Sequence, residues 1–317
     1  MNDTRSAVRK EQTMKKIVKP LVSVLIIAAV FSVCFVFRGE LADTLRGVIG
    51  MLRGAESGEL ELHVIDVGQG DSILIRGDDS AVLVDTGTYN SRGALAEYLR
   101  VNNAYRIDCL IITHPHADHI GGAEYIVRNF KVGCVMLCDS DSTSAPLTRL
   151  LTAVDEHGIK LIEPSVGSLT KVGNIAFRVL SPLPGLDTAS NDGSIVMRVE
   201  WGSTAFMLTG DAETPAEELI LGNYPPEELR SNLLKLGHHG SGTSTSEKFL
   251  DAVSPEWVAI SCGKDNDYGH PHREVLERLH AFGLDDEHIL RTDRYGSVVF
   301  VSDGREVRLE RQYDKAA

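Results

Sequence analysis

Three histidines and an aspartate fall within six positions of the segment Thr113–His119, directly after the apolar run Cys109–Ile112. Imidazoles and carboxylates are common ligands of divalent metals. An apolar run that ends in such a cluster predicts a strand that delivers these side chains into one loop, and Gly121–Gly122 then opens a helix. Because residues of the same types recur downstream, a histidine-rich loop formed by chance is a poor explanation. The segment therefore predicts a metal site, for two ions.

From Leu60 onward, strand patterns and helix patterns alternate. The early strands follow one another as hairpins, αβ units come next, and the second half of the chain repeats that order. An α/β fold with two packed sheets and helices on both outer faces explains this order better than one doubly wound sheet. The expected strands are 60–67, 72–76, 81–85, 107–112, 132–138, 174–180, 194–201, 204–209, 232–236, 257–261, 288–291, 297–301 and 305–310, and the expected helices are 91–102, 121–130, 146–157, 214–221, 245–253 and 272–282.

The N-terminal region predicts a membrane anchor. Leu21–Phe37 has no charged residue over 17 positions, which is about 25 Å of helix and the short end of a membrane span. A cleaved signal is the alternative, but its apolar part is usually shorter and ends at small residues, whereas this run ends in Phe35-Val36-Phe37-Arg38. The basic flank precedes the run, so the positive-inside rule places the body of the chain outside the cell. We expect a cytoplasmic tail over 1–16, a single-pass anchor or uncleaved signal over 17–37, a linker over 38–58, one large folded domain over 59–312 and a tail over 313–317.

Charge limits the possible substrates. Residues 1–37 have a net charge of +4 and the whole chain has −13, which leaves −17 for residues 38–317. Such a body is not a generic nucleic-acid binder, because phosphate backbones need a positive surface. An anionic substrate would have to be held locally, by metal ions and a few donors. The cysteines outside the predicted anchor all lie in apolar runs, so we expect buried free thiols.

Five further polar clusters follow predicted strands, where α/β proteins place their sites. Asp71 ends the loop between the first two expected strands and Asp85 ends the third, and each can accept a hydrogen bond from a metal-bound histidine. Asp211 follows the run Phe206–Thr209, and its two oxygens can bridge two metals. In the paired His238 and His239, we expect one metal ligand and one group that faces the substrate. The fifth cluster runs from Asn266 to His272 and is rich in donors.

Several of these motifs resemble those of the metallo-β-lactamase fold superfamily. The set Asp-Val-Gly-Gln-Gly-Asp, Val-Asp-Thr-Gly, Thr-His-Pro-His-Ala-Asp-His-Ile-Gly-Gly, Asn-Asp-Gly-Ser-Ile-Val, Leu-Thr-Gly-Asp-Ala, Gly-His-His-Gly-Ser and Tyr-Gly-His-Pro resembles the extracellular hydrolase domain of ComEC-type DNA-uptake proteins and their free-standing relatives. The resemblance covers roughly residues 60–310. It implies a four-layer αββα sandwich, here preceded by one transmembrane helix in place of a polytopic channel.

The resemblance also implies a ligand set. His114 and His116 would bind one ion, Asp118, His119 and His238 would bind the other, and Asp211 would bridge the two. Members of the superfamily usually have a third histidine at the first ion, where this chain has Ser190-Asn191-Asp192-Gly193. Asn191, Asp192 or water could fill that gap. One or two ions, zinc or manganese, are therefore expected.

The predicted activity is metal-assisted hydrolysis of a phosphodiester. Two divalent ions lower the pKa of a shared water and neutralise phosphate oxygens. Asp118 is expected to orient or deprotonate this water, and the other catalytic or substrate-contacting residues are expected to be His239, His270, Asn191, Asn266, Tyr268 and Ser241.

The resemblance and the outside location point to DNA, and the acidic body favours single strands. Two alternatives stay open. One is a phosphorylcholine-esterase-like hydrolase of the cell wall, which needs an aromatic pocket for a quaternary ammonium group; the only two tryptophans lie in strand patterns. The other is a catalytically silent metal-binding module, suggested by the missing histidine. The sequence does not indicate an oligomeric state.

Overall fold

The computed structural model describes residues 58–312, whose strands form two large sheets that pack face to face. The first sheet runs β17 (Val307–Gln312), β16 (Val298–Ser302), β1 (Leu60–Val64), β2 (Ile73–Arg76), β3 (Ala81–Val84), β5 (Cys109–Ile111), β7 (Cys134–Met136) and β8 (Lys160–Ile162). The second runs β15 (Ile289–Arg291), β14 (Trp257–Ile260), β13 (Leu233–Lys235), β12 (Thr204–Leu208), β11 (Val196–Trp201), β10 (Ile175–Ser181) and β9 (Leu169–Val172). A small third sheet pairs β4 (Arg106–Ile107) with β6 (Lys131–Val132).

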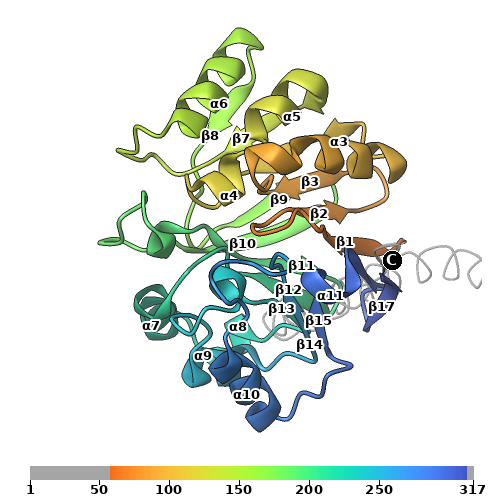
Figure 1. Ribbon diagram of the computed structural model, residues 1–317, viewed down its shortest axis with the longest axis vertical. Helices are drawn as coiled ribbons and strands as arrows, with labels where there is room; N and C mark the ends of the chain where they lie inside the picture. Colours follow the sequence, from red (N-terminus) through yellow and green to blue (C-terminus); the bar gives the residue numbers. More distant parts are fainter. Residues whose placement is uncertain (1–57, 313–317) are drawn as a thin grey trace, which may run out of the picture. The chain divides into compact units, whose positions relative to one another are not determined.

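Helices cover the outer face of each sheet, which confirms the predicted αββα layers (Figure 1). The first sheet carries α3 (Arg92–Val101), α4 (Ala117–Ile120), α5 (Ala123–Asn129) and α6 (Ala145–Glu156). The second carries α7 (Thr214–Asn223), α8 (Pro226–Leu229), α9 (Glu247–Val253) and α10 (Arg273–Phe282), and the one-turn α11 (Thr292–Tyr295) follows β15. Three 3₁₀ turns lie at Tyr89–Ser91, Asn191–Gly193 and Gly237–Gly240.

Each sheet changes from antiparallel to parallel pairing along its width. β1, β2 and β3 are antiparallel hairpins, and β3, β5, β7 and β8 are parallel. In the second sheet β9 to β12 are antiparallel, and β12 to β15 are parallel. This is the order of hairpins followed by αβ units that the sequence predicts for both halves. The parallel strands matter for function because loops at their carboxyl ends gather at one edge.

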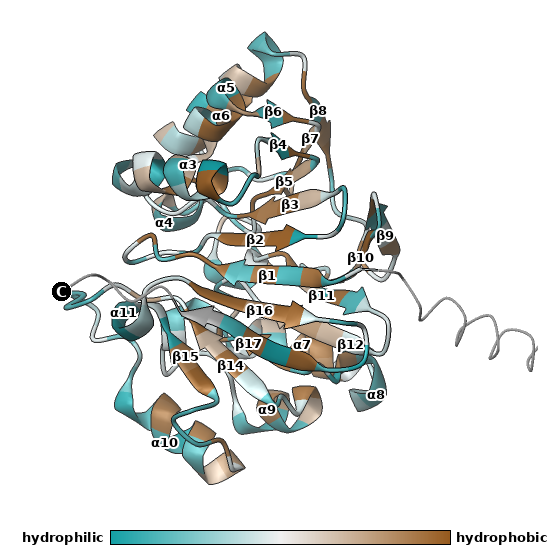
Figure 2. Ribbon diagram, turned by 90° about the vertical axis from the view of Figure 1, so that its right-hand side faces the viewer, coloured by the Kyte–Doolittle hydropathy of each residue, from teal (hydrophilic) through white to brown (hydrophobic). Residues whose placement is uncertain are grey.

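The alternating direction of the side chains along each strand explains why both faces of each sheet are covered. In β2, Ile73 and Ile75 point into the core between the sheets, whereas Leu74 packs with the helices of the first sheet. In β12, Phe206 faces the central core and Met207 faces the helices of the second sheet. Successive strand residues point to opposite faces, so a strand that is apolar throughout is covered on both sides. Figure 2 shows this apolar colouring along the central strands, between helix layers at the top and bottom.

Several elements differ from the predicted ones. The expected strand 132–138 is split, since β6 ends at Val132, Gly133 donates to Ile107 O, and β7 ends at Met136. Cys138 therefore lies beyond β7 and does not share a strand with Cys134. The short elements β8, β9, α4, α8 and α11 were not expected. The edge strands β8 and β9 are partly exposed and lack a continuous apolar pattern, and the short helices end before a helical period can repeat.

The cysteines and the N-terminal region complete the comparison with the sequence. Cys109, Cys134, Cys138 and Cys262 are free thiols, as expected, but only Cys109 and Cys262 are fully buried. Across residues 58–312 we find no helix long and apolar enough to cross a membrane. The predicted tail, anchor and linker, up to residue 57, lie outside the described residues, as does the C-terminal tail.

Candidate metal centre

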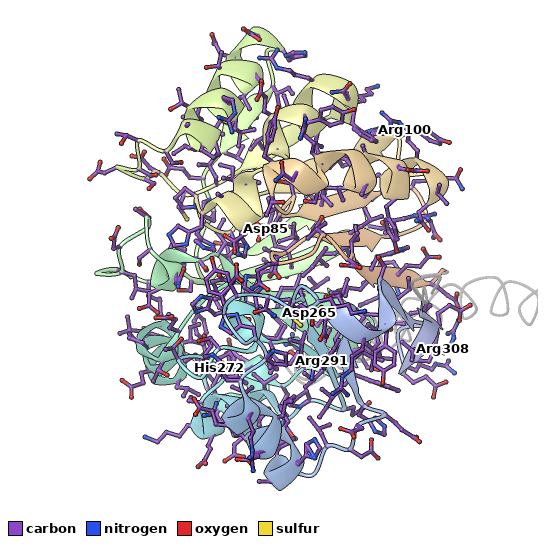
Figure 3. All side chains as sticks on the ribbon, viewed as in Figure 1. Asp85, Arg100, Asp265, His272, Arg291 and Arg308 are labelled. Carbon is purple, nitrogen blue, oxygen red and sulfur yellow. The ribbon has the colours of Figure 1, made fainter. Side chains whose placement is uncertain are left out.

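The predicted ligand residues lie in loops at the carboxyl ends of neighbouring strands. Asp85 follows β3, the segment 113–119 follows β5, Asp211 follows β12, and His238 follows β13. The first two belong to one sheet and the last two to the other. The site therefore lies where the carboxyl ends of both sheets meet. In Figure 3, Asp85 is labelled between the two helix-covered halves, far from the peripheral Arg100.

One oxygen of Asp211 is the centre of the cluster. Its Oδ2 lies 3.1 Å from His119 Nε2 and 3.5 Å from His239 Nε2. The same oxygen lies 3.9 Å from His114 Nε2 and 3.9 Å from His238 Nε2. Four imidazole nitrogens from both sheets thus converge on a single carboxylate oxygen.

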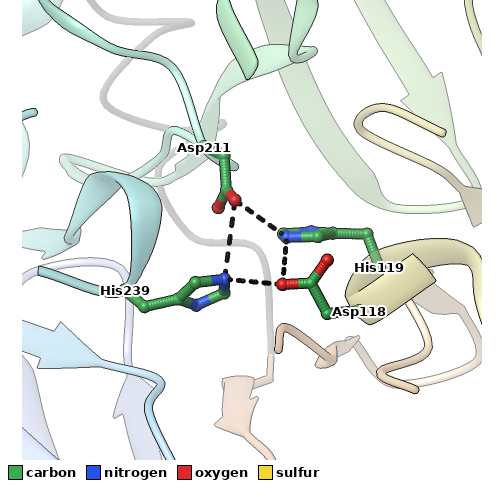
Figure 4. Close-up of side chains that lie close together, drawn as sticks. All are labelled: Asp118, His119, Asp211 and His239. Atoms are coloured by element: carbon green, nitrogen blue, oxygen red, sulfur yellow. Dashed lines mark ion pairs between the residues drawn. The ribbon is translucent and has the colours of Figure 1, made fainter. Parts of the chain in front are cut away.

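Asp118 joins two of these histidines and Asp211 in the tightest part of the cluster (Figure 4). Its Oδ2 lies 3.3 Å from His239 Nε2 and 3.9 Å from His119 Nε2. One ligand atom from each of these four residues lies within 4.8 Å of every other, which is compact enough for a metal ion. Asp118 is the accessible member, with 33% of its side chain exposed, whereas the other three are buried.

His119 and His239 are both oriented through Nδ1. His119 Nδ1 lies 2.7 Å from Asp85 Oδ2, and His239 Nδ1 lies 3.0 Å from Ser261 O and 3.3 Å from Asp71 Oδ1. Carbonyl and carboxylate oxygens only accept, so each Nδ1 must be the donor. The lone pair of the neutral ring is then on Nε2, which faces Asp211. These contacts agree with the orienting roles expected of Asp71 and Asp85.

His114 and His238 are oriented in the same way. Thr113 Oγ1 donates to Asp85 Oδ2 at 2.7 Å and can therefore accept from His114 Nδ1 at 3.1 Å. His238 Nδ1 lies 2.9 Å from Glu213 Oε1. Both rings thus also turn Nε2 toward Asp211. His116 lies at the exposed rim, its ring centroid 4.5 Å from that of His114.

The local backbone brings the loops into contact. Gly70 has φ +134°, and a Cβ there would lie 2.3 Å from Asp118 O. The next residue, Asp71, donates its backbone N–H to that oxygen at 3.2 Å. Only glycine allows this approach without a shift of the backbone. The loop after β1 is therefore held directly against the segment that carries Asp118.

At the cluster, burial and the neighbouring charges shift the pKa values of the side chains in opposite directions. Burial alone would lower the pKa of His119, but Asp211 and Asp85 outweigh it and hold that pKa well above the usual value. Burial likewise opposes a charged His239, yet Asp211 and Asp118 raise its pKa well above normal. Although burial raises the pKa of Asp211, His119 and His239 lower it well below its usual range. The carboxylates thus create a field that attracts cations, and a metal ion competes with protons for Nε2.

The donor set fits a divalent metal. Within residues 58–312, the buried atoms His114 Nε2, His239 Nε2 and Asp211 Oδ1 make no hydrogen bond. Buried polar atoms normally have a partner, so unpartnered ones that share a single point call for an explanation. Imidazole nitrogens and carboxylate oxygens are the ligands of zinc and manganese sites. The described residues therefore contain a candidate site for one or two such ions.

The paired histidines are placed differently from the sequence expectation. His239, expected to face the substrate, is 1% exposed and its Nε2 lies inside the group formed with Asp118, His119 and Asp211. His238, expected to join Asp118 and His119, is instead 25% exposed on its side chain and contacts Glu213. A Gly-His-His-Gly pattern cannot indicate which ring faces inward, because both residues adopt positive φ, 46° for His238 and 57° for His239.

One oxygen of Asp192, a candidate for the gap left by the missing histidine, is used at the start of α7. Its Oδ1 accepts from the backbone N–H groups of Glu213 at 3.1 Å and Ala216 at 3.3 Å. It thereby caps α7 from outside that helix, whose own first residues supply no side-chain cap. Asn191 Nδ2 lies 3.4 Å from Glu213 Oε1 and 3.5 Å from His238 Nε2, and its buried Oδ1 is unpartnered among the described residues.

The predicted substrate-contacting residues also differ from expectation. The amide of Asn266 is used within its own loop, donating to Gly263 O and His270 O and accepting from Tyr268 N and His270 N. It holds the loop and is not free to bind a phosphate. Ser241 is buried, and its hydroxyl lies 3.0 Å from that of Thr243.

His270 and Tyr268 lie beside the cluster. The ring of His270 lies 5.5 Å from that of His238 and 6.2 Å from that of His239. Burial, together with the charge of His239, lowers its pKa to about 4, so near neutral pH the ring is uncharged and can donate one N–H. Tyr268 stacks on His270 with centroids 5.6 Å apart and is 67% exposed. It presents an aromatic face to solvent next to the candidate site.

Two charged residues of the site were missed in the sequence. Lys235 is 0% exposed, and its Nζ lies 2.8 Å from Asp71 Oδ2. Its signal was a single charge inside the apolar run Leu233–Leu236. Glu213 binds His238 and also accepts from Thr243 Oγ1 at 2.8 Å. It lies two positions after Asp211, but nothing in that spacing indicates a contact across to the loop after β13.

Comparison with known proteins supports the fold and the motifs. A family model described as the metallo-beta-lactamase superfamily matches residues 65–264. The chain is 32% identical over 262 residues to "ComE operon protein 3" of Bacillus subtilis, covering 77% of this chain and 33% of that protein. It is 32% identical over 243 residues to "Competence protein ComA" of Neisseria gonorrhoeae, covering 76% and 32%. The chain thus spans about a third of the length of these curated relatives.

A solved structure shares the fold at low identity. CmlA, "a diiron beta-hydroxylase from Streptomyces venezuelae", aligns with a TM-score of 0.50 and 16% identity, covering 74% of this chain and 53% of that one. At this identity the likeness concerns the fold alone.

Proposed function

The chain belongs to the metallo-beta-lactamase superfamily, and on that premise we propose that it is a metal-dependent phosphodiester hydrolase that acts on DNA. The observation that carries this proposal is the convergence of four histidine Nε2 atoms within 3.9 Å of Asp211 Oδ2. One or two divalent ions, zinc or manganese, would be held there with Asp211 between them. When bound, they lower the pKa of water and neutralise phosphoryl oxygens.

Asp118 is the residue best placed to handle the attacking water. It is the partly exposed carboxylate of the tight group. Burial raises its pKa, but the neighbouring His239, with Nε2 3.3 Å away, and the charge of His119 lower it to about 2. The carboxylate is therefore ionised at neutral pH and can accept a hydrogen bond from water as it reacts.

Single-stranded DNA is the proposed substrate. Two curated relatives carry competence names, and the chain resembles about a third of each. The net charge of −17 over residues 38–317 disfavours long duplex, which binds mainly through its phosphates. Tyr268 offers a face on which an unpaired base can stack.

We place this chemistry on the outer side of a cell membrane. The uncharged run Leu21–Phe37 would serve as a single-pass anchor, and its basic N-terminal flank would keep residues 1–16 in the cytoplasm. A protease-protection experiment on intact cells tests the orientation. A tag placed after residue 317 should be digested, and a tag before residue 1 should survive.

The phosphorylcholine alternative has no specific support. An aromatic pocket for a quaternary ammonium group would need several exposed rings around one point, and Tyr268 is a single ring beside the site. Trp201 is 1% exposed, and Trp257 packs against Phe300 and His288. The silent-module alternative rests on the missing histidine alone, and the hydrolysis assays below decide between it and the hydrolase.

The proposal is tested on the full-length chain in detergent, loaded with zinc or manganese. We expect cleavage of labelled single-stranded DNA and of bis-p-nitrophenyl phosphate, with slower cleavage of duplex. Asp211→Ala should abolish both activities, whereas Asp286→Ala, a change at an exposed carboxylate, should abolish neither. Cleavage of the small ester without DNA would make the nuclease assignment wrong, and no cleavage of either would end the hydrolase proposal.

Tyr268→Ala tests the stacking role separately. It should raise KM for single-stranded DNA about 5- to 150-fold, because base–aromatic stacking contributes roughly 1–3 kcal/mol. The small ester has no nucleobase, so its kinetics should not change. An equal loss on both substrates would show that the tyrosine supports the site and does not contact DNA.

A further inference from the structure

We propose that each histidine of the Gly-His-His-Gly loop serves a different metal ion, and that His238, oriented by Glu213, completes the first site. This inference rests on the metal-binding part of the proposed function. It would give the first ion His114, His116 and His238, and the second ion Asp118, His119 and His239. Asp211 would be shared.

The distances around Asp211 separate the histidines into two pairs. His119 and His239 lie 3.1 Å and 3.5 Å from its Oδ2 and form a compact group with Asp118. His114 and His238 both lie 3.9 Å from the same oxygen and are outside that group. His116 adjoins the second pair, because its ring lies against that of His114. By distance, the four histidines thus form a near pair and a far pair around one carboxylate oxygen.

Glu213 gives His238 the tautomer that a ligand needs. Its Oε1 accepts from His238 Nδ1 at 2.9 Å, from Thr243 Oγ1 at 2.8 Å and from Asn191 Nδ2 at 3.4 Å. A carboxylate that accepts at Nδ1 leaves the lone pair of the neutral ring on Nε2, the atom that faces Asp211. The same logic holds for Asp85 and His119. Glu213 is therefore a positioning residue for His238.

Asn191 supports Glu213 and His238 and is not itself the third ligand of the first ion. Its Nδ2 donates toward Glu213 and lies 3.5 Å from His238 Nε2. The orientation of the amide follows from chemistry, since its oxygen would be repelled by the carboxylate. Asn191 therefore fills the predicted gap by holding the residues that complete the site.

The backbone of the loop explains how adjacent residues can serve two ions. His238 and His239 both have left-handed φ and ψ values, 46° and 46° for His238 and 57° and 21° for His239. Non-glycine residues adopt this conformation rarely, and it persists where the surroundings impose it. His238 N donates to Gly210 O, and Ser241 N donates to His238 O. The turn is thus tied to the loop of Asp211, with the two rings 6.1 Å apart.

Metal counting on the full-length chain tests the inference without using activity. The chain is stripped with a chelator, titrated with cobalt(II), and measured by elemental analysis and by visible absorption of the bound cobalt. The wild-type chain should bind two equivalents. His238→Ala and His239→Ala should each bind one, and the two spectra should differ because different ligands remain. His280→Ala, a change at an exposed histidine away from the site, should still bind two.

Glu213 supplies a second test that does not remove a ligand. Glu213→Ala should weaken the affinity for one of the two ions about 10- to 100-fold, the usual effect of removing a partner that orients a metal-bound histidine. Glu213→Gln should restore much of this loss, because its amide oxygen can still accept from Nδ1. Asn191→Ala should still bind two equivalents. If His238→Ala fails to fold, the Glu213 variants decide the question.

Some outcomes would overturn the inference. These are one equivalent or none in the wild-type chain, two equivalents at unchanged affinity in His238→Ala, or loss of an ion in Asn191→Ala but not in His238→Ala. The phosphodiesterase proposal fails independently, if a chain with two bound ions cleaves no phosphodiester.

Discussion

The buried ion pair between Lys235 and Asp71 should be important for stability. Lys235 is 0% and Asp71 1% exposed, and their charged atoms lie 2.8 Å apart. Lys235→Met keeps the volume but leaves a carboxylate without its lysine in the protein interior. Breaking a buried pair in this way costs about 3–5 kcal/mol. The pair joins β13 of one sheet to the loop after β1 of the other, so the loss should affect the whole fold.

Thermal and denaturant unfolding measure the effect. With about 2–4 °C per kcal/mol for a chain of this size, Tm should fall by roughly 6–20 °C. The measurement is made without metal, so that changes in ion binding do not contribute. Arg273→Ala, which breaks an ion pair whose arginine side chain is 90% exposed, is the matched control and should leave the midpoint unchanged.

A double variant separates the buried charge from simple packing. Asp71→Asn in the Lys235→Met background removes the uncompensated carboxylate, so it should recover part of the lost stability. If Lys235→Met unfolds like Arg273→Ala, or if the double variant is less stable than the single one, the buried pair does not stabilise the fold as we argue.

Three further outcomes are expected. Asp192→Ala should destabilise the chain by about 1 kcal/mol in denaturant unfolding, because α7 loses its cap, and an unchanged midpoint would contradict that role. Cys134 should be alkylated by iodoacetamide with a midpoint near pH 7, because the hydrogen bond from the Cys109 thiol outweighs burial and lowers the pKa of Cys134 to about 7. Cys138 should react far more slowly, because burial raises its pKa to about 12. Equal rates at the two cysteines would refute the assignment. Asp85→Ala should weaken metal affinity about 10- to 100-fold in competition with a chelator, because it removes the acceptor for His119 Nδ1; unchanged affinity would show that the contact does not orient the ring.

Much of the site could be predicted because its residues occur in short motifs after apolar strands. The cluster 113–119, Asp211 and the paired histidines all lie in loops after strands, as the sequence indicated, although which of the paired histidines is buried was not predicted. The αββα layers follow from the order of hairpins and αβ units. Local patterns are sufficient here because strand alternation and loop position are properties of consecutive residues.

Which atoms meet was decided by the tertiary structure. The burial of His239, the cap that Asp192 provides to α7, and the use of Asn266 within its own loop depend on contacts between segments or on backbone angles that no motif encodes. Glu213 and Lys235 became part of the site only because two sheets bring their carboxyl ends together.

The sequence by itself determined the chemistry of this protein: the residue types, their order, and the strands that deliver them. Only the fold decided which of these residues can act as metal ligands, because that depends on the orientation of each histidine ring. Orientation is imposed by distant acceptors such as Asp85, Glu213 and Ser261 O, which contact the ring nitrogens only after the two sheets have packed.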